Sequence, residues 1–261
     1  MNSNLIHING AAGVLGDSFR KSFEKTHPAH SFELADINSS RLSDIASEMN
    51  GKARQLIVGN MFDPDSVAYK AVTESQADIV IWNAARNLDV HEPVSERLSL
   101  RQQQNACLER RLETLLEQSR EKTERLLIVV NSITAIFGEE IDSAKGIAEQ
   151  QDWHYPLMKG DQHRMLMDYR AELLSKGVDL SVLYPGAFQS HFTDPDQALK
   201  LANGMGKKVR NYRGRPNLKQ EGILKPYEIT DSVANVQPDG LRERESLMMP
   251  STTKEIVDRN G

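Results

Sequence analysis

Short apolar runs alternate along this chain with longer stretches in which apolar residues recur at helical spacing. The apolar runs occupy residues 5–9, 30–36, 54–58, 77–82, 125–131 and 178–184. Segments with helical spacing follow these runs. The first ends at residue 23, and the others occupy residues 39–49, 63–74, 95–119 and 155–175. Strands joined through helices form right-handed units that build a parallel sheet covered on both faces. The pattern therefore predicts an α/β fold with a doubly wound parallel sheet in three α/β/α layers.

Composition limits the class of protein further. The chain has 261 residues, of which 39% are hydrophobic and 26% charged, and it lacks repeats and Pro/Gly/Ser linkers, so we predict a single domain over residues 1–261. The net charge of −5 gives no basic signature for nucleic acid. The only cysteine, Cys107, cannot form an internal disulfide, and the strongest apolar run, residues 126–130, is too short to span a membrane. A cytoplasmic protein without membrane or nucleic-acid partners is expected.

The first predicted strand runs into a turn in which Gly10, Gly13 and Gly16 are spaced Gly-x-x-Gly-x-x-Gly. Glycine permits a tight turn, a close approach of the backbone to a pyrophosphate, and close packing of the following helix on the strand. The free N–H groups at the start of that helix bind phosphates. The turn therefore predicts a dinucleotide site formed by Gly10, Ala12, Gly13, Val14, Leu15 and Gly16.

An acidic residue ends the second predicted strand. Asp36 follows Gly16 by 20 residues, where a carboxylate accepts the adenosine ribose hydroxyls and repels a 2′-phosphate. The carboxylate therefore favours NAD as the cofactor over NADP, and its neighbour Ile37 is a further candidate cofactor-binding residue. Arg41, five residues later, is a candidate for neutralising a phosphate instead. The alternative interpretation of Asp36 is a turn or capping residue before the next helix.

Four further segments follow the predicted strands in order. Residues 60–63 read Asn-Met-Phe-Asp, with Asn60 and Met61 after the third strand, and Asn83, Ala84 and Ala85 follow the fourth. Residues 155–159 contain Tyr-x-x-x-Lys, and residues 185–190 contain Pro185, Gly186, Phe188 and Ser190. In this order the segments resemble the motifs of the short-chain dehydrogenase/reductase family, whose fold is of the Rossmann type and whose cofactor is NAD or NADP.

The resemblance extends over residues 4–193 and implies that these segments hold the cofactor. It departs from the family pattern at Asn60, which replaces a carboxylate, and at Ala85, which replaces a glycine. The glycine spacing is closer to the extended and atypical branches of the family. A clear form of the family's closing glycine-containing strand is missing from the end of the chain, where only a short apolar run occupies residues 247–249.

Hydride transfer at a carbon that bears oxygen requires a proton to move at that oxygen. A tyrosine has an unperturbed pKa near 10 and is a poor base at neutral pH, but a lysine four residues later lies on the same helix face and stabilises its phenolate. We therefore predict Tyr155 as the general acid/base and Lys159 as its electrostatic partner. The resemblance implies that Lys159 also holds the nicotinamide ribose. The alternative is a buried tyrosine beside a surface lysine.

A third group should hydrogen-bond the substrate oxygen. Ser132 and Thr134 follow the fifth predicted strand and project to the same side of an extended chain. The family pattern Asn-x-x-Ser, counted from Asn131, selects Thr134, with Ser132 as the second choice. Residues 137–154 are then an inserted loop beside the active site. Asn105 matches the family's fourth catalytic residue, which holds a relay water, although an ordinary solvated asparagine fits as well.

Residues 198–220 contain seven Lys and Arg side chains and no acidic residue. They fall within residues 190–225, where the family has its substrate lid. This basic segment favours an anionic small-molecule substrate such as a nucleotide-sugar, a phosphate ester or a carboxylate. The alternative is a solvated loop with incidental charge. The histidines lack metal-ligand spacing, and we predict no metal.

The leading functional hypothesis is an NAD(P)-dependent oxidoreductase that interconverts an alcohol and a ketone through Tyr155, Lys159 and Thr134. A second hypothesis is an NAD-dependent epimerase or dehydratase that acts on a nucleotide-sugar. A third is a cofactor-binding regulatory protein without turnover, which the departures from the family pattern suggest.

Two predicted helices carry more apolar residues than one buried face needs. These residues are Leu98, Leu108, Leu112 and Leu115 on one helix, and Leu157, Met158, Met165 and Leu166 on the other. In the family these helices pair between subunits, so we predict a homodimer or homotetramer.

Overall fold

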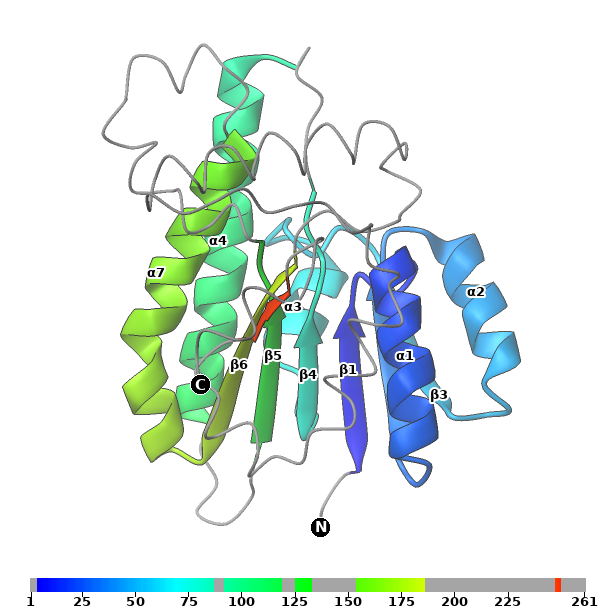
Figure 1. Ribbon diagram of the computed structural model, residues 1–261. Coiled ribbons are helices and arrows are strands. Elements are labelled where there is room, and N and C mark those ends of the chain that lie inside the picture. The colour runs from blue at the N-terminus through cyan, green and yellow to red at the C-terminus, as the bar shows by residue number, and fades with distance from the viewer. Residues whose placement is uncertain (1–3, 87–91, 119–124, 133–153, 186–246, 250–261) are drawn as a thin grey trace, which may run out of the picture.

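The computed structural model describes residues 4–86, 92–118, 125–132, 154–185 and 247–249. Seven strands form one sheet in the order β3-β2-β1-β4-β5-β6-β7, and all neighbouring strands are parallel (Figure 1). The strands are β1 (Leu5–Asn9), β2 (Ser31–Asp36), β3 (Ala53–Val58), β4 (Ile79–Trp82), β5 (Arg125–Val130), β6 (Val178–Pro185) and β7 (Leu247–Met249). The helices are α1 (Val14–Thr26), α2 (Ser39–Glu48), α3 (Val67–Thr73), α4 (Val94–Glu117) and α7 (His154–Ser175).

Helices cover both faces of the sheet. On one face, Ile6 and Ile8 of β1 pack with Phe19 of α1 and Leu42 of α2. On the other face, residues of β4 and β5 pack with residues of α3, α4 and α7. Alternate side chains of a strand point to opposite faces, so an apolar run in a central strand is buried on both sides. The structure confirms the predicted doubly wound, three-layer fold.

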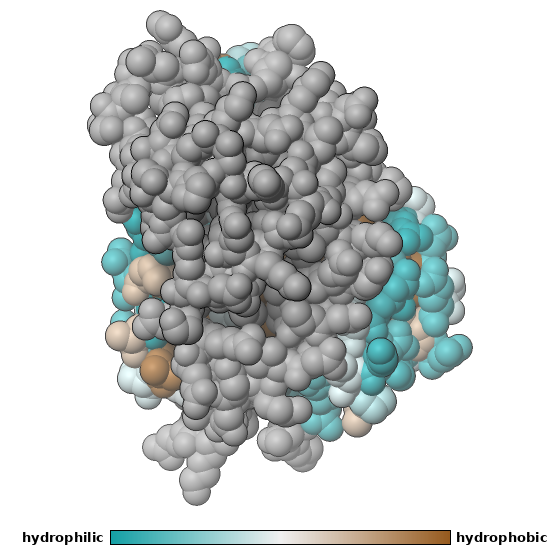
Figure 2. All heavy atoms as spheres, viewed as in Figure 1, coloured by the Kyte–Doolittle hydropathy of each residue, from teal (hydrophilic) through white to brown (hydrophobic). Residues whose placement is uncertain are grey.

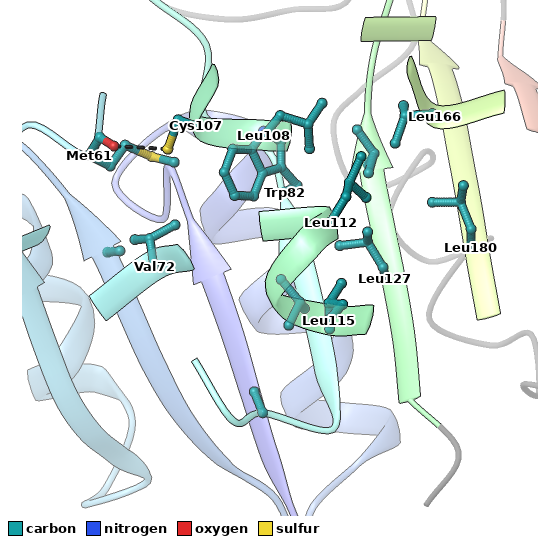
Figure 3. Packing of buried hydrophobic residues seen from close by; sticks show 14 of the residues in the cluster. Met61, Val72, Trp82, Cys107, Leu108, Leu112, Leu115, Leu127, Leu166 and Leu180 are labelled. Atoms are coloured by element: carbon teal, nitrogen blue, oxygen red, sulfur yellow. Dashed lines mark hydrogen bonds between the residues drawn. The ribbon is translucent and has the colours of Figure 1, made fainter. Parts of the chain in front are cut away.

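The face covered by α4 contains Trp82, one of the largest fully buried side chains (Figure 3). Trp82 of β4 lies against Leu108 and Leu112 of α4 in the cluster that also contains Leu127 of β5. The thiol of Cys107 donates a hydrogen bond to the carbonyl oxygen of Met61 at 3.0 Å, which connects α4 to the loop after β3. Burial raises the pKa of Cys107 to about 12, as expected for a packing residue rather than a nucleophile.

Two predicted elements are corrected. The helix expected over residues 63–74 occupies only Val67–Thr73, because the N–H of Ser66 bonds to the carbonyl of Asp63 in a turn and the Ser66 side chain then caps the helix. The short apolar run at residues 247–249, which carries no clear strand pattern in the sequence, is β7 and pairs with residues 183–185 of β6.

The flank formed by α2 is polar. Hydrophilic residues dominate it at the right of the space-filling view (Figure 2), and its apolar Leu42 and Ile45 point into the core. None of the helices in the described part of the chain is long and apolar enough to cross a membrane.

Candidate active site

The glycine turn after β1 and the segment after β4 are hydrogen-bonded to each other. The side-chain oxygen of Asn9, the last residue of β1, accepts the N–H groups of Asn83 at 2.7 Å and Ala84 at 2.8 Å. The amide of Asn83 donates in return to the carbonyl of Gly10 at 3.1 Å. The predicted residues Gly10, Asn83 and Ala84 therefore lie together at the carboxyl edge of the sheet. Asn9 was not among the predicted site residues, although a polar residue at the end of an apolar strand could have indicated such a role.

Two glycines of the turn are required by the packing. Gly10 has φ +67°, and a Cβ atom there would lie 2.9 Å from the Cα of Ala84. A Cβ atom on Gly16 would lie 2.1 Å from the carbonyl oxygen of Gly10. Both positions allow α1 and β4 to approach the turn more closely than a larger residue permits.

The N-terminus of α1 is arranged for an anion. Asn38 caps α2 and Ser66 caps α3 with their side chains, whereas the N-cap of α1 is Gly13, which makes no side-chain capping bond. The first N–H groups of a helix have no partner within the helix. The N–H groups at Val14 and Leu15 thus suit the phosphates of a dinucleotide, and the predicted turn fits that ligand.

Asp36 lies at the carboxyl end of β2, next to this turn. One carboxylate oxygen accepts the N–H of Ala12 at 3.0 Å, and the other accepts the N–H of Asn38 at 3.0 Å. The helix cap is Asn38 rather than Asp36, because the Asn38 side chain accepts the N–H of Arg41 at 3.1 Å. An ionised carboxylate has about four acceptor positions, so Asp36 retains capacity for ribose hydroxyls. Its neighbour Ile37 is exposed.

Two more predicted segments border the site. The side chain of Asn60 accepts the N–H of Phe62 at 3.2 Å and shapes the loop after β3, in which Met61 is buried. Beyond the exposed Ala85, the buried amide of Gln104 on α4 accepts the N–H of Arg86 at 2.9 Å and donates to its carbonyl at 2.7 Å. Gln104 therefore fixes the segment after β4, a role that the sequence did not indicate.

The Tyr155 side chain meets the end of β5. Tyr155 lies in the first turn of α7, and its hydroxyl is hydrogen-bonded to the side chain of Ser132, two residues beyond β5. The ammonium nitrogen of Lys159 lies 5.7 Å from the centre of the Tyr155 ring. It donates to the carbonyl of Val130 at 3.3 Å and to the side-chain oxygen of Gln162 at 3.2 Å. The helix and the strand end thus bring together the hydroxyl, phenol and ammonium groups that the chemistry requires.

Burial sets the charge states of this group. Burial raises the pKa of Tyr155 to about 12, opposed by the hydrogen bond to Ser132, which lowers it. Burial lowers the pKa of Lys159 to about 8. At neutral pH, Tyr155 is a protonated acid and most of the Lys159 side chains carry a positive charge.

Asn105 makes a contact between helices. Its amide donates to the carboxylate of Asp161 on α7 at 3.1 Å, and Arg101 and Arg164 bind the same carboxylate. This contact ties α4 to α7 two residues beyond Lys159. Asn131 completes the link to the sheet, because its amide donates to the carbonyl of Lys159 at 3.1 Å.

Several predicted residues fall outside the described part of the chain. They are Thr134, Gly186, Phe188 and Ser190, most of the loop at residues 137–154, the lid at residues 190–225 and the basic segment 198–220. The backbone of Pro185 ends β6 and pairs with Met249. Within the described residues, no group of three or more His, Cys, Asp or Glu side chains could hold a metal ion.

Comparison with solved structures identifies the fold. No family model and no curated protein matches the sequence. A 3-ketoacyl-(acyl-carrier-protein) reductase from Brucella melitensis, complexed with NADH, superposes with a TM-score of 0.66 at 17% identity, covering 95% of this chain and 96% of that one. The chain has the fold of the short-chain dehydrogenases/reductases.

Two further structures with the short-chain dehydrogenase/reductase fold are similar over the same length. A short-chain dehydrogenase from Streptomyces avermitilis has a TM-score of 0.66 at 15% identity and covers 99% of this chain and 90% of its own. A 3-oxoacyl-(acyl-carrier-protein) reductase from Agrobacterium tumefaciens with NADP bound has a TM-score of 0.64 at 13% identity and covers 95% and 93%. The expected resemblance is thus confirmed at the level of the fold.

Proposed function

We propose that this chain is an NAD(P)-dependent oxidoreductase of the short-chain dehydrogenase/reductase type that interconverts an alcohol and a ketone. The observation that carries the proposal is the hydrogen bond between Tyr155 and Ser132, with the Lys159 ammonium 5.7 Å from the tyrosine ring. The glycine turn, whose helix start is open to a phosphate, lies at the same edge of the sheet.

In the direction of reduction, Tyr155 donates its proton to the carbonyl oxygen of the substrate. A pKa of about 12 keeps the phenol protonated until that step. Ser132 is hydrogen-bonded to the phenol and positions it for this transfer. Thr134 lies outside the described residues and, with Ser132 as the second choice, stays our predicted hydroxyl for binding the carbonyl oxygen. The positive charge of Lys159 stabilises the phenolate that remains. The nicotinamide, when bound, supplies the hydride.

The residues present favour NAD(H) as the cofactor. The N–H groups of Val14 and Leu15 would hold the pyrophosphate, and Asp36 would accept the ribose hydroxyls and repel a 2′-phosphate. Arg41, the candidate for binding such a phosphate, donates instead to the carboxylate of Asp17 at 3.2 Å. The structural neighbours include proteins bound to either cofactor, so they do not decide between the two.

A 3-ketoacyl thioester is the substrate class that we propose to test first. Two of the neighbours are named as reductases of ketoacyl groups on an acyl carrier protein. The seven cations of residues 198–220 would attract an anionic substrate or carrier. These neighbours do not favour a nucleotide-sugar epimerase or a protein without turnover.

Replacing Tyr155 by Phe tests the assignment. Phe keeps the ring and removes the proton donor, so kcat/KM for a ketoacyl thioester with NADH should fall by a factor of about 100 to 10,000. The Kd for NADH, measured by fluorescence titration, should change by less than about twofold, since Asp36 and the glycine turn hold the other end of the cofactor. Tyr169→Phe on the same helix is the matched control and should retain activity. Full activity of the Tyr155→Phe variant would refute the proposed role.

A further inference from the structure

Asp17, in the first turn of α1, is bound by three cations. One carboxylate oxygen accepts two hydrogen bonds from Arg20, at 2.6 and 3.1 Å, and the other lies 3.0 Å from the Lys21 ammonium. Both of these partners belong to α1. The third partner, Arg41, comes from α2 and reaches the second oxygen at 3.2 Å. Helices α1 and α2 lie side by side on the same face of the sheet, as Figure 1 shows.

These contacts form part of a closed ring around the end of β2. The N–H of Ala12 donates to Asp36, which also accepts the N–H of Asn38, and Asn38 in turn accepts the N–H of Arg41. The Arg41 side chain then returns to α1 at Asp17. Asn38 therefore connects the backbone of Arg41 to the proposed ribose carboxylate of Asp36, while the Arg41 guanidinium binds the carboxylate of Asp17.

We propose that Asp17 is a specificity-determining residue, which selects NAD over NADP by holding Arg41 away from the position of a 2′-phosphate. This inference rests on the proposed cofactor site. A 2′-phosphate beside Asp36 meets a negative charge, and the cation best placed to compensate for that charge is already engaged. Selection thus has two parts, repulsion by Asp36 and withdrawal of Arg41.

The ion pair between Arg41 and Asp17 can break without leaving Asp17 unpaired. Its side chain is 40% exposed, whereas that of Asp17 is 9% exposed, and partly exposed ion pairs are weak. Asp17 keeps Arg20 and Lys21 when Arg41 leaves. Hydrogen bonds from Arg20 and Lys21 help to lower the pKa of Asp17 against the effect of burial, so its carboxylate remains charged. Loss of the Asp17 charge would free Arg41 without removing it.

The test compares D17N, R41Q and the double variant by fluorescence titration with NADH and NADPH. In D17N, the released Arg41 should bind the 2′-phosphate, so the Kd for NADPH should fall by about fivefold or more while that for NADH changes by less than about twofold. The double variant should lose this gain. R41Q alone should leave both values within about twofold of wild type, since the Arg41 guanidinium is bound to Asp17 and not free for a phosphate.

An unchanged Kd ratio in D17N would overturn the inference. D17N removes a partner of the buried Arg20 and could therefore destabilise the protein. R41Q changes only the partly exposed Arg41, so its result tests the inference independently of whether D17N folds. Weaker NADPH binding in R41Q, by about fivefold, would mean that Arg41 already binds the phosphate and that the inference is wrong. If wild-type protein binds neither dinucleotide, the proposed function itself fails. If D17N binds NADH normally and its ratio of Kd values for NADPH and NADH is unchanged, only the proposed role of Asp17 is refuted.

Discussion

Lys159 is a charged side chain buried between β5 and α7. Its ammonium donates to the Val130 carbonyl and the Gln162 amide oxygen, both of which are uncharged. Burial therefore lowers the pKa of Lys159 to about 8, and the folded protein releases this proton more readily than the unfolded chain. The residue proposed to stabilise the phenolate of Tyr155 thus destabilises the fold while it is charged.

The free energy of unfolding should therefore depend on pH through the titration of Lys159. Below pH 8, both states carry the charge and the penalty is complete, and the penalty is relieved as the pH rises from the folded pKa toward that of the unfolded lysine. The free energy of unfolding of the wild type should therefore rise with pH, whereas Lys159→Met lacks this proton and this rise. The free energy of unfolding of Lys159→Met minus that of the wild type should fall by about 2.5 kcal/mol between about pH 7 and pH 10. Urea denaturation at several pH values measures the difference. The exposed Lys176→Met variant controls for the lost charge, and a pH-independent difference for Lys159→Met would contradict the buried-cation interpretation.

At the scale of the element, the position of α1 depends on a glycine. The Cβ atom of an alanine at position 16 would lie 2.1 Å from the carbonyl oxygen of Gly10 and 2.9 Å from the Cα of Ala11. Both neighbours are backbone atoms, which cannot rotate away. At Gly13, the added Cβ atom would meet the same carbonyl at 3.3 Å, which a small shift accommodates.

Gly16→Ala should therefore displace α1 from β1. We expect the free energy of unfolding to decrease by about 2–3 kcal/mol, because overpacking against backbone forces the helix to move. NADH binding should weaken as well, since the N–H groups at the start of α1 move with the helix. Gly13→Ala is the matched control and should cost less than about 1 kcal/mol. Equal losses in urea denaturation would show that packing at Gly16 does not hold the helix.

At the scale of the whole molecule, the apolar residues of α4 and α7 are mostly accounted for within one chain. Leu108, Leu112 and Leu115 of α4 are buried in the core, and so are Leu157, Met158 and Leu166 of α7. These six residues are therefore not surplus to the core of one chain, and they do not support subunit pairing. The exposed apolar residues of α4 are Leu98 and Val94, four positions apart and on one face of the helix.

We retain the homodimer or homotetramer as a prediction that rests on this smaller face. Light scattering should give at least twice the chain mass of 29.3 kDa. A charge at Leu98 would have to be buried in the interface, so Leu98→Glu should yield the single-chain mass. Val67→Glu, at an exposed apolar residue of α3, should leave the mass unchanged. A wild-type mass near 29 kDa would remove the prediction.

Much of the fold follows from local patterns. The strands before residue 186 begin and end within two residues of their predicted limits. In the central strands the reason is that a parallel strand buried on both faces needs a continuous apolar run. The closing strand β7 has only three residues, Leu247–Met249, and a run so short carries no period of its own. Its assignment depends on pairing with β6, far away in the sequence.

The alternation of apolar runs and helical spacing predicts the three layers. The glycine turn and the spacing of Tyr155 and Lys159 are read directly along the chain, since each depends on residues a few positions apart. The packing of the helices on the sheet determines which side chains from separate elements meet. Among the described residues, it brings Ser132 to Tyr155, Asn105 to Asp161 and Gln104 to Arg86. It also turned Arg41 onto Asp17 rather than toward the ribose site. Such contacts join side chains from separate elements, and their distances depend on how helices pack on the sheet, which no local pattern encodes.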